Sequence, residues 1–280
     1  MTVNAEHLSD RELRAHAHAI EISGHTAIPG QISSAALDEL REITTRALTS
    51  VQEAIGRGIR TPFQPASRYY QAASALYRWG NAALSLLEHP VVTSLSDALL
   101  DRPQLNDLTV FSAVPVPTGE ADPGATAWHR DCHNFEQARS SGHLWFLFYL
   151  DDFTSENGAT WIVPGSHHLA SALEPSLGPA WSNPDLDAFP SRRQLVGRAG
   201  DLVVIDARAL HTSGRNSTSE PRRLLNLGVV DHRFGDRIRA NHWDVAGSRI
   251  RESASERLRC LLGADWSGPR GSGPPSIVPD

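Results

Sequence analysis

The sequence contains no lysine, and all 26 of its basic residues are arginine. A chain without lysine cannot form a Schiff base with a carbonyl substrate or with pyridoxal phosphate, and it cannot use the lysine of a phosphate-binding P-loop. The absence therefore excludes these classes of enzyme. We attribute it to codon usage in a GC-rich genome rather than to function.

Cysteines and long apolar segments are also scarce. The two cysteines, Cys132 and Cys260, are too few for a disulfide framework. No apolar run reaches the roughly 18 residues of a membrane-spanning helix, and the N-terminus lacks the layout of a signal peptide. A formal net charge of −6 argues against nucleic acid as a partner, because surfaces that bind it are basic. We therefore expect a cytoplasmic protein with neither a membrane nor a nucleic acid as partner.

Helix and strand patterns divide the chain into two parts. Residues 33–56 predict a helix, with Ser33 or Ser34 as its N-cap and apolar residues along one face. Further helical segments are expected over about 67–88 and 91–100. Beyond these, short β-rich runs separated by turn residues indicate a sandwich or a barrel. The runs are 108–116, 143–150, 159–165, 201–207 and 222–230.

No clear domain boundary separates the helical part from the β-rich part, so we expect one domain over residues 1–266. Its helical part would cover about 1–105 and its β core about 106–232, with a flexible Gly/Pro-rich tail at 267–280. The segment 169–199 contains four prolines and interrupts the β-rich runs. We expect it to form a loop that covers one end of the β core.

The segment W-H-R-D at 128–131 contains a candidate metal site. Residues two apart in a strand project to the same face, so His129 and Asp131 would point together while Arg130 points away. One imidazole nitrogen and one carboxylate oxygen offer two adjacent ligands. A third ligand would complete the two-histidine, one-carboxylate arrangement that suits non-haem Fe(II) and leaves positions open for a cosubstrate and dioxygen.

A zinc site is the alternative, because Cys132 and His133 lie close to His129 in the sequence. Structural zinc requires four ligands with characteristic cysteine spacings, and the chain has only two cysteines. We therefore interpret Cys132 and His133 as residues of a pocket wall or of the scaffold.

A candidate for the third ligand lies downstream, where a strand is followed by His211, a polar turn and a second strand. If the two strands form a hairpin centred at 216–217, His211 lies opposite Arg222 and shares its face. Ser213 would share this face as well. An arginine at this place suits bidentate capture of a carboxylate. A one-residue bulge would select Arg223 instead of Arg222.

Taken together, these segments resemble the phytanoyl-CoA dioxygenase family of Fe(II)- and 2-oxoglutarate-dependent oxygenases. The resemblance spans roughly residues 20–230 and implies a mainly β fold with flanking helices, a double-stranded β-helix (a cupin-like jelly roll). Three segments carry it: WHRD at 128–131, LDDFTSENGATWIVPGSHH at 150–168, and GDLVVIDARALHTSGRN at 200–216 with the Arg222 that follows.

The resemblance also implies roles for individual residues. His129, Asp131 and His211 correspond to the iron ligands of the family. Arg222 corresponds to the anchor of the C5 carboxylate of 2-oxoglutarate, and Ser213 matches a position that often assists this anchor. These correspondences predict Fe(II) as the metal, with 2-oxoglutarate and dioxygen as cosubstrates.

Other residues near the predicted site carry weaker predictions. Arg130 departs from the glutamine that is common in the family, and we expect it to support the ligands or to contact the substrate. His133 and Trp145 are further candidate substrate contacts. Asp131 argues against halogenation, because related halogenases carry a small residue at that position.

Two classes of function remain open. The first is a dioxygenase that oxidises, and by default hydroxylates, a C–H bond of a small molecule, for example in secondary-metabolite tailoring, with release of succinate and CO2. Desaturation or ring formation would be variants of it. The second is a non-redox jelly-roll metal protein: a zinc-type hydrolase or isomerase, or a catalytically silent binding module. The predicted Arg222 anchor separates them, because a hydrolase needs no dicarboxylate cosubstrate.

Overall fold

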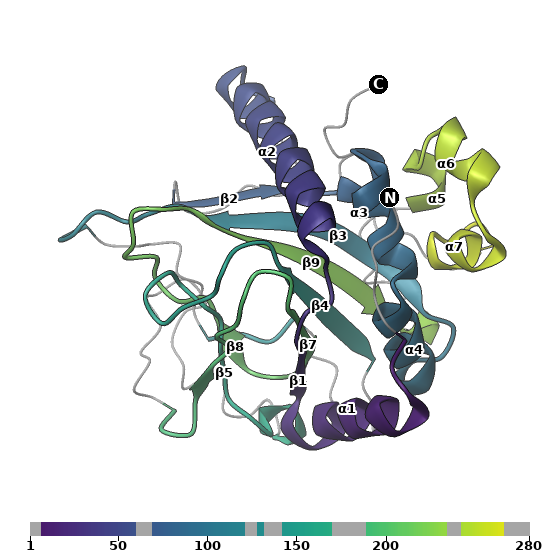
Figure 1. Cartoon of the computed structure of the whole chain (residues 1–280), viewed down its shortest axis with the longest axis horizontal. Coiled ribbons are helices and arrows are strands. Elements are labelled where there is room, and N and C mark those ends of the chain that lie inside the picture. The colour runs from purple at the N-terminus through teal and green to yellow at the C-terminus, as the bar shows by residue number, and fades with distance from the viewer. Residues whose placement is uncertain are drawn as a thin grey trace.

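Two antiparallel sheets form the centre of the protein (Figure 1). The computed structural model describes residues 7–59, 69–120, 128–131, 142–169, 189–233 and 242–265. The large sheet has six strands in the order β1-β7-β4-β9-β3-β2, and the small sheet has three in the order β6-β5-β8. The strands are β1 (His25–Ile28), β2 (Tyr70–Ala73), β3 (Gln104–Ala113), β4 (His143–Tyr149), β5 (Trp161–Ile162), β6 (Arg193–Gln194), β7 (Leu202–Asp206), β8 (His211–Thr212) and β9 (Arg222–Val230).

Helices cover one face of the large sheet, and α2 crosses it (Figure 1). None of the helices in the described ranges is long and apolar enough to cross a lipid bilayer. The α-helices are α1 (Asp10–Ser23), α2 (Ser34–Gly56), α3 (Asn81–Ser85), α4 (Pro90–Leu99), α5 (His242–Val245), α6 (Ser248–Ser253) and α7 (Glu256–Leu261), and the 3-10 helices are η1 (Leu76–Arg78), η2 (Leu86–Glu88) and η3 (Ser166–His168).

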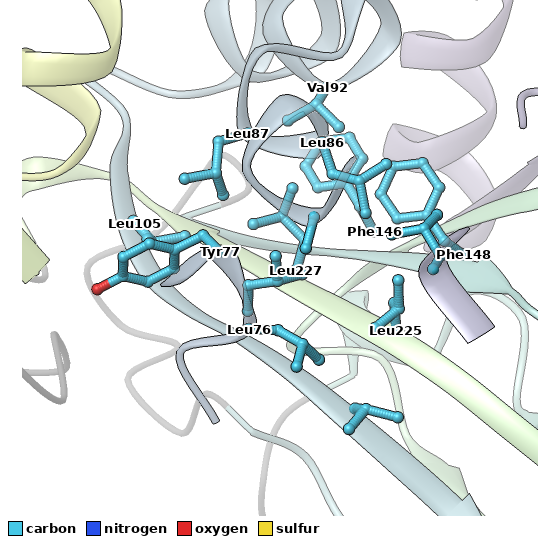
Figure 2. Packing of buried hydrophobic residues seen from close by; sticks show 14 of the residues in the cluster. Leu76, Tyr77, Leu86, Leu87, Val92, Leu105, Phe146, Phe148, Leu225 and Leu227 are labelled. Carbon is cyan, nitrogen blue, oxygen red and sulfur yellow. The ribbon is translucent and has the colours of Figure 1, made fainter. Parts of the chain in front are cut away.

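Strand alternation in β4 separates two apolar clusters. Phe146 and Phe148 are fully buried against the helices, and Figure 2 shows them near Leu225 of β9 and Leu86 of η2. The intervening side chains, Trp145 among them, belong to a second cluster on the opposite face of the sheet. Because successive side chains of a strand point to opposite faces, one strand both anchors the helices and lines the interior between the sheets.

Several sequence predictions hold in the structure. The helix expected at 33–56 is α2, and the Ser33 hydroxyl caps it by accepting from the backbone N–H of Ala36 over 3.4 Å. The helix expected at 91–100 is α4. Strands β3, β4, β5, β7 and β9 lie within or overlap the five predicted runs, although β5 has only two residues.

The helix predicted over 67–88 is wrong in its first part. Residues 70–73 form the edge strand β2, which pairs with β3, and only short helices follow. The alanine-rich sequence favours a helix locally, but pairing with β3 overrides this preference. The strands β1 and β2 also show that the part expected to be helical contributes to the large sheet. The division into one domain and a tail stays a prediction, and the tail at 267–280 lies outside the described residues.

Candidate metal centre

The three predicted ligands, His129, Asp131 and His211, lie together on the wall of a cavity that residues of both sheets line. Their ligand atoms are all within 4.8 Å of one another. Nε2 of His129 is 3.7 Å from one carboxylate oxygen of Asp131, and Nε2 of His211 is 3.3 Å from the other. Two imidazole nitrogens and one carboxylate oxygen are the donor set of a non-haem iron site, so these residues fit Fe(II).

Backbone hydrogen bonds bring the ligands together. His129 and His211 form an isolated antiparallel bridge, in which each backbone N–H donates to the carbonyl of the other over 3.0 Å. The backbone N–H of Asp131 donates to the carbonyl of Ala207 over 2.9 Å. The segment 128–131 is therefore held against the chain at 207–211, and the two segments supply all three ligands.

The protonation of His211 is compatible with metal binding through Nε2. Its Nδ1 is 2.9 Å from the carbonyl of Ala209, which can only accept, so Nδ1 carries a proton and donates. Such a bond fixes the ring and leaves Nε2 for a metal. Burial lowers the pKa of His211, but the hydrogen bond and charge of Asp131 outweigh burial and raise the pKa above its usual value.

The pKa of Asp131 shifts in the opposite direction. Burial alone would raise it, but the hydrogen bond to His211 and the charges of His211 and His129 lower it well below the usual range. The carboxylate is therefore ionised across the neutral range. An ionised carboxylate beside two imidazoles is the form that a divalent cation needs.

Arg130 lies between two of the ligands but supports the chain instead of lining the cavity. Its side chain is buried, and Nη1 donates to the carbonyl of Ser166 over 2.8 Å and to the carbonyl of Arg208. Arg208 in turn forms a buried ion pair with Asp206, with Nε 3.0 Å from the carboxylate. These contacts connect 128–131 to the segment that carries His211, and the role of Arg130 stays a prediction.

Arg222 lies buried near Tyr70, which lines the cavity. Its exposed fraction is 2%. Its guanidinium donates to the carbonyls of Asn157 and Gly158, and its central carbon is 4.5 Å from the ring centre of Phe153. Within the described ranges, no carboxylate forms an ion pair with it. A buried arginine that has only carbonyl partners is expected to bind an anion.

Tyr70 and Ser213 belong to the same part of the site. Both line the cavity, and their hydroxyl groups lie near each other. Burial raises the pKa of Tyr70, although the Arg222 charge and the bond to Ser213 oppose this. Ser213 thus lies where the resemblance placed it. Tyr70 was missed, because the edge strand that carries it was predicted to be a helix.

The hairpin that was used to place Arg222 is wrong. His211 belongs to β8, which pairs with β5 in the small sheet, whereas Arg222 belongs to β9 and pairs with Ala113 of β3 in the large sheet. The preference for Arg222 over Arg223 nevertheless agrees with the structure. Alternation along β9 turns Arg223 to the other face, where it forms an ion pair with Asp151 at 2.7 Å.

The remaining predicted site residues differ in position. Trp145 lines the cavity and is 6% exposed. His133 lies outside the described residues, and so does most of the loop expected at 169–199. Their predicted roles stay predictions.

The cavity has a volume of about 140 Å³ and a mixed lining. Three apolar side chains of the large sheet line the same cavity as the metal ligands: Leu147, Ile205 and Leu224. Polar residues that the sequence alone did not identify also line it. The alternation of side chains along β3 and β9 could have indicated these residues, because they lie on the face of each strand that points into the cavity. They are Asp107, Thr109 and Asn226.

Comparison with solved structures confirms the predicted jelly-roll fold. The α-ketoglutarate-dependent epimerase SnoN from nogalamycin biosynthesis is 23% identical with a TM-score of 0.58, over 80% of this chain and 84% of that one. HygX from Streptomyces hygroscopicus, solved with nickel, 2-oxoglutarate and hygromycin B, is 16% identical with a TM-score of 0.60, over 78% of this chain and 87% of that one.

Sequence relatives and a family model cover most of the chain. The dioxygenase ALT11 of Alternaria alternata is 25% identical over 271 residues, 90% of this chain and 82% of that protein. The dioxygenase sphC of Aspergillus fumigatus is 22% identical over 245 residues, which are 84% of this chain but only 63% of that longer protein. Residues 21–224 match the model of the phytanoyl-CoA dioxygenase family, and the chain belongs to this family.

Proposed function

We propose that the protein is an Fe(II)- and 2-oxoglutarate-dependent dioxygenase that oxidises, and by default hydroxylates, a C–H bond of a small molecule. The observation that carries this proposal is the pairing of a His-Asp-His cluster with a buried arginine in one site. Membership of the family and the names of the relatives support it. SnoN, from nogalamycin biosynthesis, and HygX, solved with hygromycin B, support a substrate from secondary metabolism.

His129, Asp131 and His211 would hold the iron. Bound iron in this class couples the decarboxylation of 2-oxoglutarate to oxidation of the substrate, with release of succinate and CO2. Three protein ligands leave the remaining positions of an octahedron open, which is what two cosubstrates require. The Nδ1–H bond of His211 to Ala209 keeps its ring in the orientation that presents Nε2.

The arginine end of the site would bind the distal carboxylate of 2-oxoglutarate. Arg222 offers a planar guanidinium, and the hydroxyl groups of Tyr70 and Ser213, which line the cavity, would add neutral hydrogen bonds. Leu147 and Leu224 line the cavity and would exclude water from the chain of the cosubstrate. Burial of this kind strengthens each charged contact inside the site.

The location and partners follow the same proposal. We propose a small-molecule substrate, a cytoplasmic location and no nucleic-acid partner. The acidic net charge of −6 and the small number of cysteines support this.

Succinate release tests the proposed activity. Protein loaded anaerobically with Fe(II) should convert 2-oxoglutarate to succinate when air is admitted, at least slowly without substrate, and His211→Ala should not. If the wild-type protein neither releases succinate nor binds 2-oxoglutarate, a non-redox metal protein with the same fold becomes the better explanation. Isothermal titration of 2-oxoglutarate into the Fe(II) protein under nitrogen supplies the binding result independently of turnover.

A further inference from the structure

Two polar side chains in the cavity have polar atoms without hydrogen-bond partners. Nε1 of Trp145 and Oδ1 of Asn226 are both buried and find no partner in the described part of the chain. Both residues line the same cavity as the three metal ligands. Leaving a buried polar atom unpaired costs about 1–3 kcal/mol, and native proteins rarely tolerate it. A pair of such atoms in one cavity therefore indicates a bound group that the protein alone does not provide.

The two side chains are neighbours on adjacent strands. Asn226 of β9 pairs with Leu147 of β4, and Trp145 pairs with Gly228, two residues further along β9. Such diagonal neighbours share one face of the sheet, with their Cα atoms about 7–8 Å apart. One ligand group, or two adjacent groups of one molecule, can therefore contact both.

Gly228 determines how the indole ring lies. A Cβ at this position would be 2.3 Å from Cζ3 of Trp145 and 2.9 Å from Cε3, so the six-membered ring of the indole rests directly on the glycine. The nitrogen is on the opposite side of the indole from these two carbons. The ring thus turns Nε1 away from β9, and only a glycine permits this contact.

Trp145 lies nearer to the metal end of the cavity than to Arg222, whereas Asn226, opposite Leu147, lies between the two ends. The backbone N–H of Asp131 donates to the carbonyl of Ala207, and the backbone N–H of Ala207 donates to the carbonyl of His143. These three residues therefore lie side by side across the strands, at the same position along the strand direction. Trp145 is two residues along β4 from that position, about 7 Å. Arg222 is six residues along β9 from the strand partner of Trp145, about 20 Å.

The chemistry of the unpaired atoms excludes both cosubstrates as their sole partner. The buried Oδ1 of Asn226 needs a hydrogen-bond donor. Ionised 2-oxoglutarate and dioxygen carry no hydrogen-bond donor. The indole N–H, in contrast, needs an acceptor. Water and a hydroxyl group both donate and accept, and a substrate hydroxyl that takes the place of such a water would satisfy the two residues.

We propose that Trp145 and Asn226 form a subsite that recognises a hydroxyl group of the substrate in the cavity that the metal ligands line. The inference rests on the proposed oxygenase function and adds the substrate class to it: a hydroxyl-bearing small molecule. Asn226 accepts the hydroxyl hydrogen, and Trp145 donates to the hydroxyl oxygen. Both are specificity-determining residues, and neither is needed to hold the metal or to anchor the distal carboxylate of 2-oxoglutarate.

Cyclohexanol and cyclohexanone are matched probes, because they share size and an oxygen acceptor but only the alcohol has a donor. Their binding is measured by ligand-observed NMR on Ni(II)-substituted protein saturated with 2-oxoglutarate, so no turnover is required. The alcohol should bind about three- to tenfold more tightly, the usual net effect of one hydrogen bond. Equal binding of the two probes, no binding of either, or binding only without 2-oxoglutarate overturns the inference.

Variants assign the preference to the two residues. Asn226→Leu should abolish the preference for the alcohol. Trp145→Phe should weaken the binding of both probes, because the oxygen of each probe accepts from the indole N–H. The affinity for 2-oxoglutarate should stay within a few-fold of wild type in each, which shows that the site is folded and that the cosubstrate is not the ligand. A large loss of 2-oxoglutarate affinity in Asn226→Leu would assign the subsite to the cosubstrate and refute the inference. Asn81→Leu, the same substitution at an exposed position, is the control.

The two proposals can fail separately. Failure of succinate release with intact alcohol selectivity refutes the oxygenase assignment alone. Normal succinate release without alcohol selectivity refutes the hydroxyl subsite alone.

Discussion

Replacing Arg222 by alanine should remove most of the affinity for 2-oxoglutarate while the metal stays bound. The side chain is 2% exposed, and its partners in the protein are two carbonyl groups and the face of Phe153. No described carboxylate neutralises it, so the dicarboxylate would be its ionic partner. The metal ligands come from other segments and would be unchanged.

The size of the effect follows from burial. Removing one member of a buried charge pair costs about 3–5 kcal/mol. Since about 1.4 kcal/mol corresponds to a tenfold change in Kd, the affinity should fall at least about a hundredfold. Arg223 provides the matched control. It leaves β9 on the opposite face, its side chain is 24% exposed, and its ion pair with Asp151 is of the kind worth about 1 kcal/mol or less.

Isothermal titration of 2-oxoglutarate into anaerobic, Fe(II)-loaded protein measures the effect. Arg223→Ala should stay within a few-fold of wild type, and both variants should retain one iron per chain. Near-normal affinity in Arg222→Ala would refute the cosubstrate assignment. An equal loss in both variants would instead refute the view that alternation along β9 separates the two arginines.

Three further predictions concern the metal, the pH dependence of stability and the backbone near the anchor. Alanine at any one of the three ligand positions should abolish stoichiometric Co(II) binding, measured by absorption, whereas His168→Ala should retain it; the reverse result would reassign the site. The Nδ1 of His89 accepts a hydrogen bond from the first turn of α4, and burial lowers the pKa of this histidine. As the pH falls, the unfolded chain therefore takes up the proton before the folded protein does. The free energy of unfolding should decrease as the pH drops below the usual pKa of 6.5. Urea unfolding at about pH 7.5 and 5.5 should show a smaller loss in His89→Asn, which keeps a capping acceptor, and an unchanged loss would contradict this role. Gly158 has φ +86°, and a Cβ there would be 2.6 Å from the carbonyl oxygen of Gly214, so Gly158→Ala should lower both the Tm and the affinity for 2-oxoglutarate. Gly119 has a similar φ of +85° but open space around it. Gly119→Ala should therefore lower the Tm less and leave the affinity for 2-oxoglutarate unchanged.

The sequence predicts the parts of this structure whose signals are local. The helix α2 has a capping serine and a long apolar face, and β9 is an uninterrupted β-rich run, so both were predicted with nearly correct bounds. The alternation of H-x-D placed His129 and Asp131 on one side although 128–131 is not a regular strand. The structure therefore agrees with a prediction that needed only the direction of neighbouring side chains.

The parts that the sequence could not predict depend on pairing between distant segments. The strand β2 exists only beside β3, so its alanines were assigned to a helix. The chain between His211 and Arg222 crosses from the small sheet to the large one, which a turn-like sequence does not reveal. Unsatisfied atoms such as Oδ1 of Asn226 become recognisable only when every neighbour is known.

The contact between Trp145 and Gly228 constrains how this family member can diverge. Because the ring occupies the volume that any side chain at 228 would need, the two positions cannot change independently. A homologue that acquires alanine or a larger residue at 228 must first lose bulk at 145, and an intermediate with both large residues would be overpacked. Among relatives, the sizes of the residues at 145 and 228 should therefore covary. Relatives with a small residue at 145 and a larger one at 228 should have their polar substrate contacts at other positions and should act on different substrates.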